Sequence, residues 1–255
     1  MENYTERFTG KAGVYEKYRP DYAAACVDFI VRVCGWKKGS RIADLGAGTG
    51  IFTRQLLDAG FFVTAVEPGE DMRAALSESL GEHPNLSVLD TPAERTGLPS
   101  HSLDGITAAQ SFHWFDPAAF LMECRRVLQP DGWVALVWNM RDPEHPLTQE
   151  TADICRRHCP DFRGFSNSDG WQTQNVSRVL GEKPIFRRFP HSFSLDEAGY
   201  IGRYLSASYA PEPGDASYIP YINDLQAVFR KHAGNGRLLF PNTTCCYIGR
   251  PFFSD

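Results

Sequence analysis

The sequence predicts an α/β fold built on a doubly wound, mostly parallel sheet with an antiparallel edge strand and a helical cap. Segments with strand and helix patterns alternate about five times between residues 41 and 138, which is typical of parallel strands joined by helices. A glycine-rich turn follows the first strand of this series. After residue 140 the alternation stops, so we expect a segment of different organisation to be added to the sheet there.

The predicted elements of the alternating part begin at residue 21. Each strand is a short apolar or β-branched run, and each helix carries apolar residues three or four positions apart. The predicted strands cover residues 41–45, 61–66, 86–89, 103–109 and 133–138. The predicted helices cover residues 21–34, 51–59, 69–80 and 117–128. The letters P-D-G at 130–132 predict a tight turn before the fifth strand.

The C-terminal part of the chain is predicted to be mainly helical. Its predicted helices cover residues 147–158, 195–206 and 218–232, with a further helix before residue 182. The runs 185–193 and 243–248 have the pattern of strands. Because no strand–helix repeat of the earlier kind fits around these late strands, we expect them to form an antiparallel pair at the edge of the sheet.

The composition is that of an ordinary globular protein, with 42% apolar and 22% charged residues. The net charge of −5 leaves no surplus of lysine and arginine for a phosphate backbone, which argues against a nucleic-acid partner. No apolar run approaches the roughly 20 residues of a membrane span, and the first residues lack the apolar region of a secretory signal. We therefore expect a cytoplasmic protein without a membrane partner, present as a monomer or a homodimer.

The seven cysteines do not predict a disulfide framework, because their number is odd in a chain of 255 residues. Cys155, His158 and Cys159 would share one face of a helix, which is a partial ligand set for a metal. A structural metal site needs further ligands, and no second cluster supplies them. We therefore expect no metal.

The glycine-rich turn contains Gly46, Gly48 and Gly50. A strand, a glycine turn and a helix bind an adenosine cofactor because the glycines allow close approach and the helix N-terminus presents free N–H groups. A dinucleotide fingerprint requires a glycine at the position that Ile51 occupies. A tight strand–helix connection without a ligand is the plainer interpretation of the same pattern.

Two carboxylates favour one class of adenosine cofactor. Asp44 precedes the first glycine, where it would repel a pyrophosphate and attract a cationic ligand. S-adenosylmethionine (SAM) carries both a sulfonium and an amino group. Glu67 follows the second strand and can accept both ribose hydroxyls. The charges therefore favour SAM over NAD or FAD, although Asp44 as a helix cap and Glu67 as a turn residue are the structural alternatives.

Three motifs in this order resemble the class I SAM-dependent methyltransferases, in particular their type-11 small-molecule group. They are D-L-G-A-G-T-G at 44–50, A-V-E-P at 65–68 and L-Q-P-D-G-W at 128–133. The stretches Y-E-K-Y-R-P-D-Y at 15–22 and A-A-Q-S-F-H-W-F-D at 108–116 are similar to trans-aconitate methyltransferase-like proteins. The resemblance covers roughly residues 8–140. It implies a seven-stranded, Rossmann-like sheet and methyl transfer to a small molecule, such as a carboxylate or a hydroxyl compound.

The resemblance also implies which residues bind the cofactor. Asp44 would act on the amino group of SAM, Glu67 would hold the ribose, and the segment before Pro20 would fold over the cofactor as a lid. The cofactor-binding residues expected in this way are Tyr18, Arg19, Asp44, Gly46, Ala47, Gly48, Gly50, Glu67, Pro68, Met72, Ala93, Glu94 and Gln110. Thr91 and Pro92 depart from the usual pattern before Ala93, so the partner of the adenine amino group is not identified.

The aromatic run at 112–115 is the candidate acceptor region. We expect Phe112 and Trp114 to line the substrate pocket with Arg141, which would neutralise an acidic acceptor, and His113 is the candidate general base. The same aromatic residues could instead pack under the following helix, with Asp116 as its N-cap. Arg141 could instead be a solvated turn residue, which is the plainer interpretation. A carboxylate acceptor needs no base, so the role of His113 depends on the acceptor.

We therefore expect one methyltransferase domain over residues 1–255. Its expected parts are an N-terminal lid (1–35), a SAM-binding core (36–140), cap segments (141–182 and 195–235) and closing edge strands (185–193 and 243–250). A SAM-binding regulator without catalytic activity is the alternative from a different class. A nicotinamide-dependent oxidoreductase is a further alternative, against which Asp44 and Ile51 both argue.

Overall fold

The computed structural model describes residues 20–165 and 171–251. Its main sheet has seven strands in the order β3-β2-β1-β4-β5-β9-β6. These strands are β1 (Arg41–Leu45), β2 (Phe62–Val66), β3 (Leu86–Leu89), β4 (Leu103–Ala109), β5 (Leu128–Met140), β6 (Ile185–Pro190) and β9 (Thr243–Gly249). The first five strands in this order, β3, β2, β1, β4 and β5, are mutually parallel, and β9 runs antiparallel to both β5 and β6. The predicted fold class is confirmed, and the antiparallel strand lies one position inside the edge.

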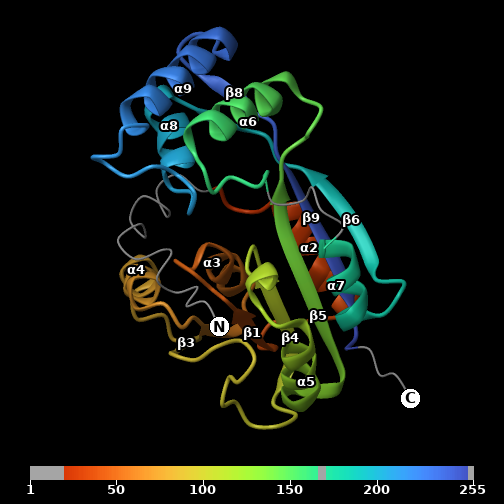
Figure 1. The fold of residues 1–255 in the computed structure, drawn as a ribbon. Coiled ribbons are helices and arrows are strands. Elements are labelled where there is room, and N and C mark those ends of the chain that lie inside the picture. Colours follow the sequence, from red (N-terminus) through yellow and green to blue (C-terminus); the bar gives the residue numbers. More distant parts are fainter. Residues whose placement is uncertain (1–19, 166–170, 252–255) are drawn as a thin grey trace.

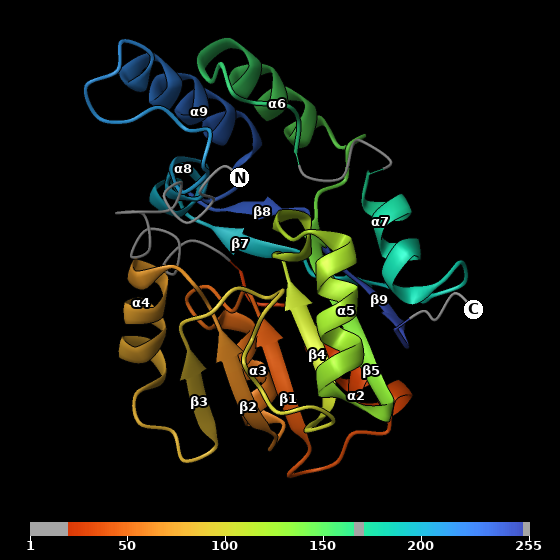
Figure 2. The ribbon, with the colours of Figure 1, turned by 60° about the horizontal axis from the view of Figure 1, so that its bottom comes forward.

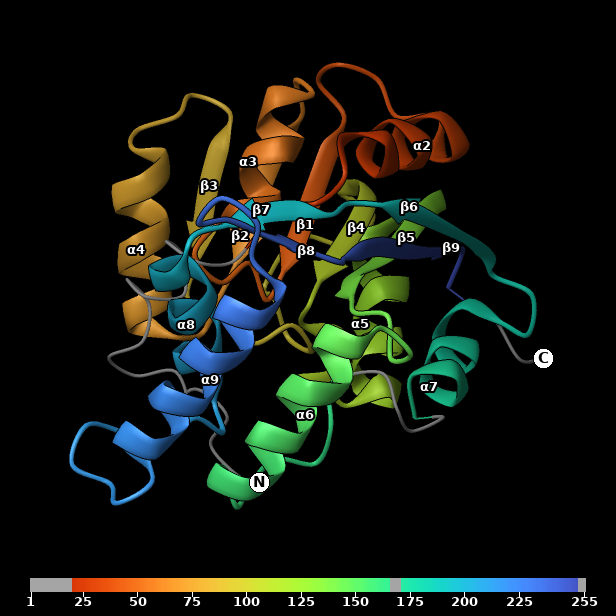
Figure 3. The same cartoon turned by 90° about the horizontal axis from the view of Figure 1, so that it is seen from above.

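Helices cover both faces of this sheet (Figure 3). They are α2 (Ala24–Cys34), α3 (Ile51–Asp58), α4 (Glu70–Leu80), α5 (Pro117–Val127) and α7 (Trp171–Leu180). One apolar layer joins α2 and α3 to the sheet, with Ile30 and Leu56 at its centre. The other layer joins α5 and α7 to the opposite face, with Phe120 and Val179 at its centre.

Two boundaries of the expected parts are wrong. The expected lid reached residue 35, but α2 packs in the core against β6 and β9. The expected cap reached residue 182, but α7 packs against α5 and β9. Both helices present apolar side chains to the sheet, so burial of those faces fixes them to the core and not to the cap.

The predicted turn at 130–132 lies within β5. The strand pairs with β4 at Leu128 and again from Trp133 onward, with a register shift between the two. A Cβ at Gly132 would lie 3.0 Å from both the carbonyl oxygen of Gln129 and the Cβ of Leu128. The backbone therefore doubles back closely here, as the P-D-G letters suggest, but as an irregularity of the strand.

The cap is a separate cluster above the carboxyl ends of the parallel strands (Figure 1, Figure 2). It contains α6 (Pro146–His158), α8 (Glu197–Leu205), α9 (Tyr218–His232) and a two-stranded sheet of β7 (Phe193–Leu195) and β8 (Leu238–Phe240). Its own apolar core is built around Tyr200, Tyr204 and Tyr221, each fully buried. The predicted strand 185–193 is split between the main sheet and this small sheet, and the sequence analysis missed β8.

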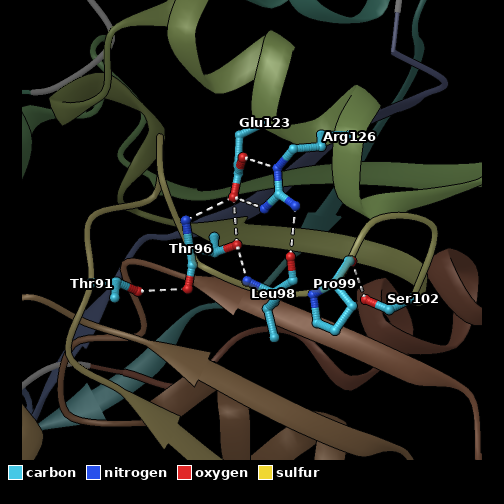
Figure 4. A network of polar contacts seen from close by, with 7 residues as sticks. All are labelled: Thr91, Thr96, Leu98, Pro99, Ser102, Glu123 and Arg126. Carbon is cyan, nitrogen blue, oxygen red and sulfur yellow. Dashed lines mark hydrogen bonds and ion pairs between the residues drawn. The ribbon is translucent and has the colours of Figure 1, made fainter.

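The long β3–β4 connection is held against α5 by one polar network (Figure 4). The buried Glu123 accepts hydrogen bonds from the backbone N and the hydroxyl of Thr96, at 2.7 and 2.5 Å. Arg126 donates to the same carboxylate at 2.7 and 2.8 Å and to the carbonyl of Leu98 at 2.7 Å. The network gives this irregular segment the hydrogen bonds that a strand or helix would otherwise provide. In the described parts of the chain, no helix is long and apolar enough to cross a membrane.

Candidate functional site

A cavity lies at the carboxyl ends of β1, β2 and β4, beneath the cap. This edge is where ligands bind in doubly wound sheets, next to the point at which the strand order reverses. The cavity is lined by Tyr22, Asp44, Gly46, Ala47, Gly48, Thr49, Ile51, Phe52, Glu67, Pro68, Gly69, Met72, Ala109, Gln110, Ser111, Trp114 and Phe115.

Nine of the residues predicted from the sequence line this cavity. They are Asp44, Gly46, Ala47, Gly48, Glu67, Pro68, Met72, Gln110 and Trp114. Phe115 also lines it, as a member of the aromatic run at 112–115, whereas the lining residues Tyr22, Thr49, Phe52 and Ser111 were not predicted. Thr49 and Ser111 lie inside the motifs at 44–50 and 108–116 and adjoin predicted positions, so each could have been found from the motif that contains it. Tyr22 offers no such signal, because only the tertiary fold brings it to the cavity.

The glycine turn follows β1 directly. Gly46 and Gly48 have φ values of 67° and 56°, a region in which side chains other than glycine are strained. The backbone N of Gly46 donates to the carbonyl of Val66 at 2.8 Å, which binds the turn to β2. A Cβ at Gly46 would lie 2.5 Å from that of Ser111. The turn thus needs glycine at this position for both conformation and space.

Gly50 has a different role from the one predicted. It precedes α3 with a φ of 85°, and a Cβ there would lie 3.0 Å from atoms of both Leu76 and Leu80. Gly50 is not among the residues that line the cavity. This third glycine therefore lets α3 and α4 approach each other.

Asp44 is the buried acid at the base of the cavity, with 1% of its surface exposed. Its carboxylate accepts hydrogen bonds from the hydroxyl of Thr53 at 2.7 Å and from that of Thr107 at 2.8 Å. Burial raises the pKa of Asp44 from 3.8 to about 6, although the two hydroxyls oppose this shift. At neutral pH the site therefore holds a negative charge that is poorly solvated and close to any bound cation.

Glu67 faces the glycine turn from the end of β2. Its two carboxylate oxygens accept hydrogen bonds from the backbone N of Gly48 and of Gly69, each at 2.8 Å. Burial raises the pKa of Glu67, and these two backbone donors act against that shift. The carboxylate is thus fixed in orientation, and each oxygen still has capacity to accept a further hydrogen bond.

Gln110 occupies the end of β4 in a strained conformation, with a φ of 56°. Its backbone N donates to the carbonyl of Val137 at 2.8 Å, and its side-chain Nε2 donates to the carbonyl of Asn139 at 3.1 Å. The next residue, Ser111, donates from its hydroxyl to the carbonyl of Leu45 at 2.7 Å. These contacts hold the end of β4 between β1 and β5, and such strain is commonly found at functional sites.

Thr49 supplies an unsatisfied polar group at the cavity wall. Its side chain is buried, and its hydroxyl has no hydrogen-bond partner in the described parts of the chain. Buried polar groups are normally paired, so a lone one in a cavity lining is consistent with a missing ligand. The cavity therefore combines apolar walls, two acids and a free hydroxyl, which suits a cationic ligand with an apolar ring system and hydroxyl groups.

Phe112 lies elsewhere than predicted. In the 3-10 helix η2 (Phe112–Trp114) its ring is fully buried and packs against Phe120 and Trp138, with ring centroids 5.3 and 6.3 Å away. The prediction that Phe112 lines the pocket is therefore wrong, because burying this ring between α5 and β5 leaves Trp114 and Phe115 to face the cavity. Phe112 instead packs under the next helix, as the alternative prediction stated. Asp116 caps that helix, α5, by accepting hydrogen bonds from the N–H groups of Ala118 and Ala119.

The remaining predicted residues that the structure describes do not line the cavity. Ala93 is buried in the core, and the Glu94 carboxylate accepts a hydrogen bond from the backbone N of Asp116 at 2.9 Å. The ring of His113 lies beside that of Trp114 in a tilted arrangement, with ring centroids 4.8 Å apart. Arg141 lies over the ring of Phe165 in the cap and is only partly exposed, so it is not a solvated turn residue. Tyr18 and Arg19 lie outside the described residues.

No group of three or more metal-binding side chains occurs within 20–165 and 171–251. The sulfur of Cys155 instead contacts the hydroxyl of Tyr221 at 3.6 Å inside the cap. Cys159 is buried in the same cluster, and the ring of His158 is paired with Asp224 at 2.8 Å. The three residues that could have started a metal site are thus used in packing α6 against α9.

Comparison with known protein families matches residues 43–136 to a family described as a methyltransferase domain. An uncharacterised methyltransferase of Mycobacterium tuberculosis is 37% identical over 150 residues, and this stretch covers 59% of each chain. The match thus spans less than two thirds of that relative. A Dictyostelium discoideum protein named as a methyltransferase is 30% identical over 248 residues, which cover 94% of this chain and 92% of the relative.

Solved structures show the same fold. A type II methyltransferase of Anaeromyxobacter dehalogenans superposes with a TM-score of 0.65 at 24% identity, covering 91% of this chain and 98% of the other. An N-methyltransferase of Haemonchus contortus, solved with phosphomonomethylethanolamine and S-adenosylhomocysteine, superposes with a TM-score of 0.53 at 13% identity. That match covers 94% of this chain and 57% of the other. At these identities the likeness concerns the fold alone.

Proposed function

Since this chain belongs to the methyltransferase family, we propose that it transfers a methyl group from SAM to a small-molecule acceptor. The supporting observation is the pair of carboxylates on either side of the glycine turn, the buried Asp44 and the partly buried Glu67. A site for a dinucleotide would place the buried Asp44 next to a pyrophosphate, which its negative charge opposes. SAM is cationic and carries a ribose diol, so the same acids favour its binding.

The residues that would hold SAM follow from the cavity lining. Asp44 would act on the cationic methionine end of the cofactor. Glu67, whose orientation is fixed by two backbone N–H groups, would accept from the ribose hydroxyls. Pro68 and Met72 line the part of the wall that suits the adenine ring, and Gln110 lies on the β4 side. The lid role of Tyr18 and Arg19 is part of the same proposal.

The cofactor supplies an activated methyl group, so the protein needs to contribute mainly alignment and exclusion of water. Phe52, Trp114 and Phe115 give the cavity apolar walls. The negative charge of Asp44 stabilises a cation in a poorly solvated place, where a charge interaction is stronger than in water. His113 does not line the cavity, so we assign it no proton transfer.

The direct test of cofactor choice is calorimetric titration with S-adenosylhomocysteine, with Glu67→Gln as the site variant. We expect wild type to bind one equivalent and Glu67→Gln to bind about 10-fold or more weakly, because hydrogen bonds to a charged group contribute about 1.5–3 kcal/mol. Glu78→Gln is the matched control, since Glu78 is an exposed acid on α4. A wild-type protein that binds NADH but no S-adenosylhomocysteine would contradict the proposal.

Binding alone does not distinguish an enzyme from a SAM-binding regulator. The distinguishing measurement is the formation of S-adenosylhomocysteine from SAM when a small-molecule metabolite extract is added. We expect formation that depends on the extract and is reduced in Glu67→Gln. Binding of the cofactor without any turnover across such extracts would favour the regulatory role.

A further inference from the structure

A cation at the start of the cap has no counter-charge among the residues that the structure describes. Arg141 follows β5 and begins the connection to α6. Its guanidinium carbon lies 4.1 Å from the centroid of the Phe165 ring and 5.6 Å from that of Tyr204. Aromatic rings hold a guanidinium by its face, which leaves the N–H groups at its edge directed outward in the plane.

Arg141 has no charged partner in the described parts of the chain. None of the ion pairs found there includes Arg141. Its Nε is enclosed by protein and has no acceptor. The ionisable groups that act on it most are Tyr204, Tyr209 and Cys155, none of which is a carboxylate. Partial burial of a cation without a charged partner is unfavourable, and an anion brought by a ligand would remove this cost.

A second cation adds to the positive potential of this region. Arg203 on α8 is 3% exposed, and its guanidinium carbon lies 4.7 Å from the centroid of the Phe240 ring. The guanidinium carbon of Arg141 lies 5.7 Å from the same centroid. Two positive charges thus approach one ring of β8 in a protein whose net charge is −5. This local sign is opposite to that of the cavity, where Asp44 and Glu67 are negative.

The position of these cations relates them to the cavity. The β7–β8 sheet of the cap lies over the carboxyl ends of the parallel strands when the molecule is seen from above (Figure 3). Gln110, a lining residue of the cavity, donates from its side chain to the carbonyl of Asn139, two residues before Arg141. Arg141 is itself not a lining residue of the cavity, so an acceptor bound by its guanidinium would have to extend from the cap to the negative cavity.

We propose that the acceptor is an anionic small molecule whose carboxylate or phosphate is bound by Arg141 on the underside of the cap. This inference rests on the proposed methyl-transfer function, because it assigns the acceptor of the same site. The planar guanidinium can hold either oxyanion through two parallel N–H groups. The anionic group anchors the acceptor, and the proposal does not require the methylated atom to belong to that group.

The test is calorimetric titration of the full chain loaded with S-adenosylhomocysteine. The probes are succinate, citrate and glycerol 3-phosphate, and their neutral counterparts are succinamide and glycerol. Arg141→Met removes the charge and keeps an apolar stem, whereas Arg141→Lys keeps the charge and removes the planar fork. Arg230→Gln is the matched control, since it removes a positive charge from an exposed position on α9.

We expect wild type to bind at least one anionic probe and neither neutral compound. Binding of carboxylates without glycerol 3-phosphate would identify a carboxylate anchor, and the reverse would identify a phosphate anchor. Arg141→Met should bind the anion about 10- to 100-fold more weakly, Arg141→Lys should be intermediate, and Arg230→Gln should match wild type. All variants should bind S-adenosylhomocysteine within about twofold of wild type, which also shows that they fold.

Two results would overturn the inference while leaving methyl transfer intact. One is a wild-type protein that binds S-adenosylhomocysteine but none of the anions. The other is an Arg141→Met variant that binds an anion as tightly as wild type does. If Arg141→Met fails to bind S-adenosylhomocysteine, Arg141→Lys decides, since unchanged anion binding there would contradict recognition by the fork. Failure of wild type to bind S-adenosylhomocysteine would instead contradict the proposed function itself.

Discussion

Replacing Asp44 by asparagine should stabilise the cofactor-free protein at neutral pH and weaken its binding of S-adenosylhomocysteine. Burial raises the pKa of this carboxyl to about 6 from 3.8. The folded state therefore prefers the protonated form, and stability is lost as the pH rises from 3.8 through 6. Above pH 6 the ionised carboxylate lowers the free energy of unfolding by a constant amount. The neutral amide of Asp44→Asn avoids this loss.

The size of this cost follows from the shift. At about 1.4 kcal/mol for each pKa unit, the difference between 3.8 and about 6 corresponds to about 3 kcal/mol. The amide can keep both hydroxyl contacts, because the Thr107 hydroxyl lies 3.4 Å from the carbonyl of Ala43 and can donate there when the amide donates to it. Asp44→Asn should thus gain up to about 3 kcal/mol at pH 8 and lose about 10- to 100-fold in affinity for the cationic ligand.

The assay is urea denaturation of the cofactor-free protein at pH 5 and pH 8, together with calorimetry. The stability gain of Asp44→Asn should be larger at pH 8 than at pH 5. Asp28→Asn, an exposed acid on α2, should change stability by less than about 0.5 kcal/mol at both values. A variant that is less stable than wild type at pH 8 would refute the assignment of Asp44 as a strained, charged group that the ligand stabilises.

Two further predictions concern the framework of the site. Gly46→Ala should lose about 2–5 kcal/mol of stability and Gly48→Ala only about 1–2 kcal/mol. The reason is that the added Cβ lies 2.5 Å from Ser111 in the first variant and has nothing within 4 Å in the second. Equal losses of the two variants in urea denaturation would contradict this prediction. Glu123→Ala should lose about 2–3 kcal/mol of stability and speed amide exchange at Thr96, because the buried N–H of Thr96 loses its acceptor. A loss of stability no larger than that of Glu82→Ala, a change at an exposed acid, would contradict this prediction.

The sheet and the cofactor side of the cavity were predictable because local patterns decide them. Strand Leu103–Ala109 and helix Tyr218–His232 have the bounds that the periodicity indicates. Asp44 and Glu67 follow from the charge logic of a turn whose position the glycines mark. These features depend on residues close together in the sequence, where propensity, capping and turn chemistry agree.

The acceptor side could not be predicted in the same way. Among neighbouring aromatic residues, only the packing of α5 decides that Phe112 is buried and Trp114 lines the cavity. Strand β8 has three residues and pairs with β7, whose residues are more than 40 positions earlier. Arg141 is flanked by rings from three distant segments, so its environment is a tertiary property. Contacts of such long sequence separation leave no local pattern.

The most direct test of the central claim is a crystal structure of the protein with S-adenosylhomocysteine. The account predicts ribose hydroxyls hydrogen-bonded to the Glu67 carboxylate and the homocysteine portion beside the turn of Gly46 and Gly48, with Asp44 below it. A ligand bound elsewhere on the molecule, or one in this cavity whose ribose does not contact Glu67, would contradict the account.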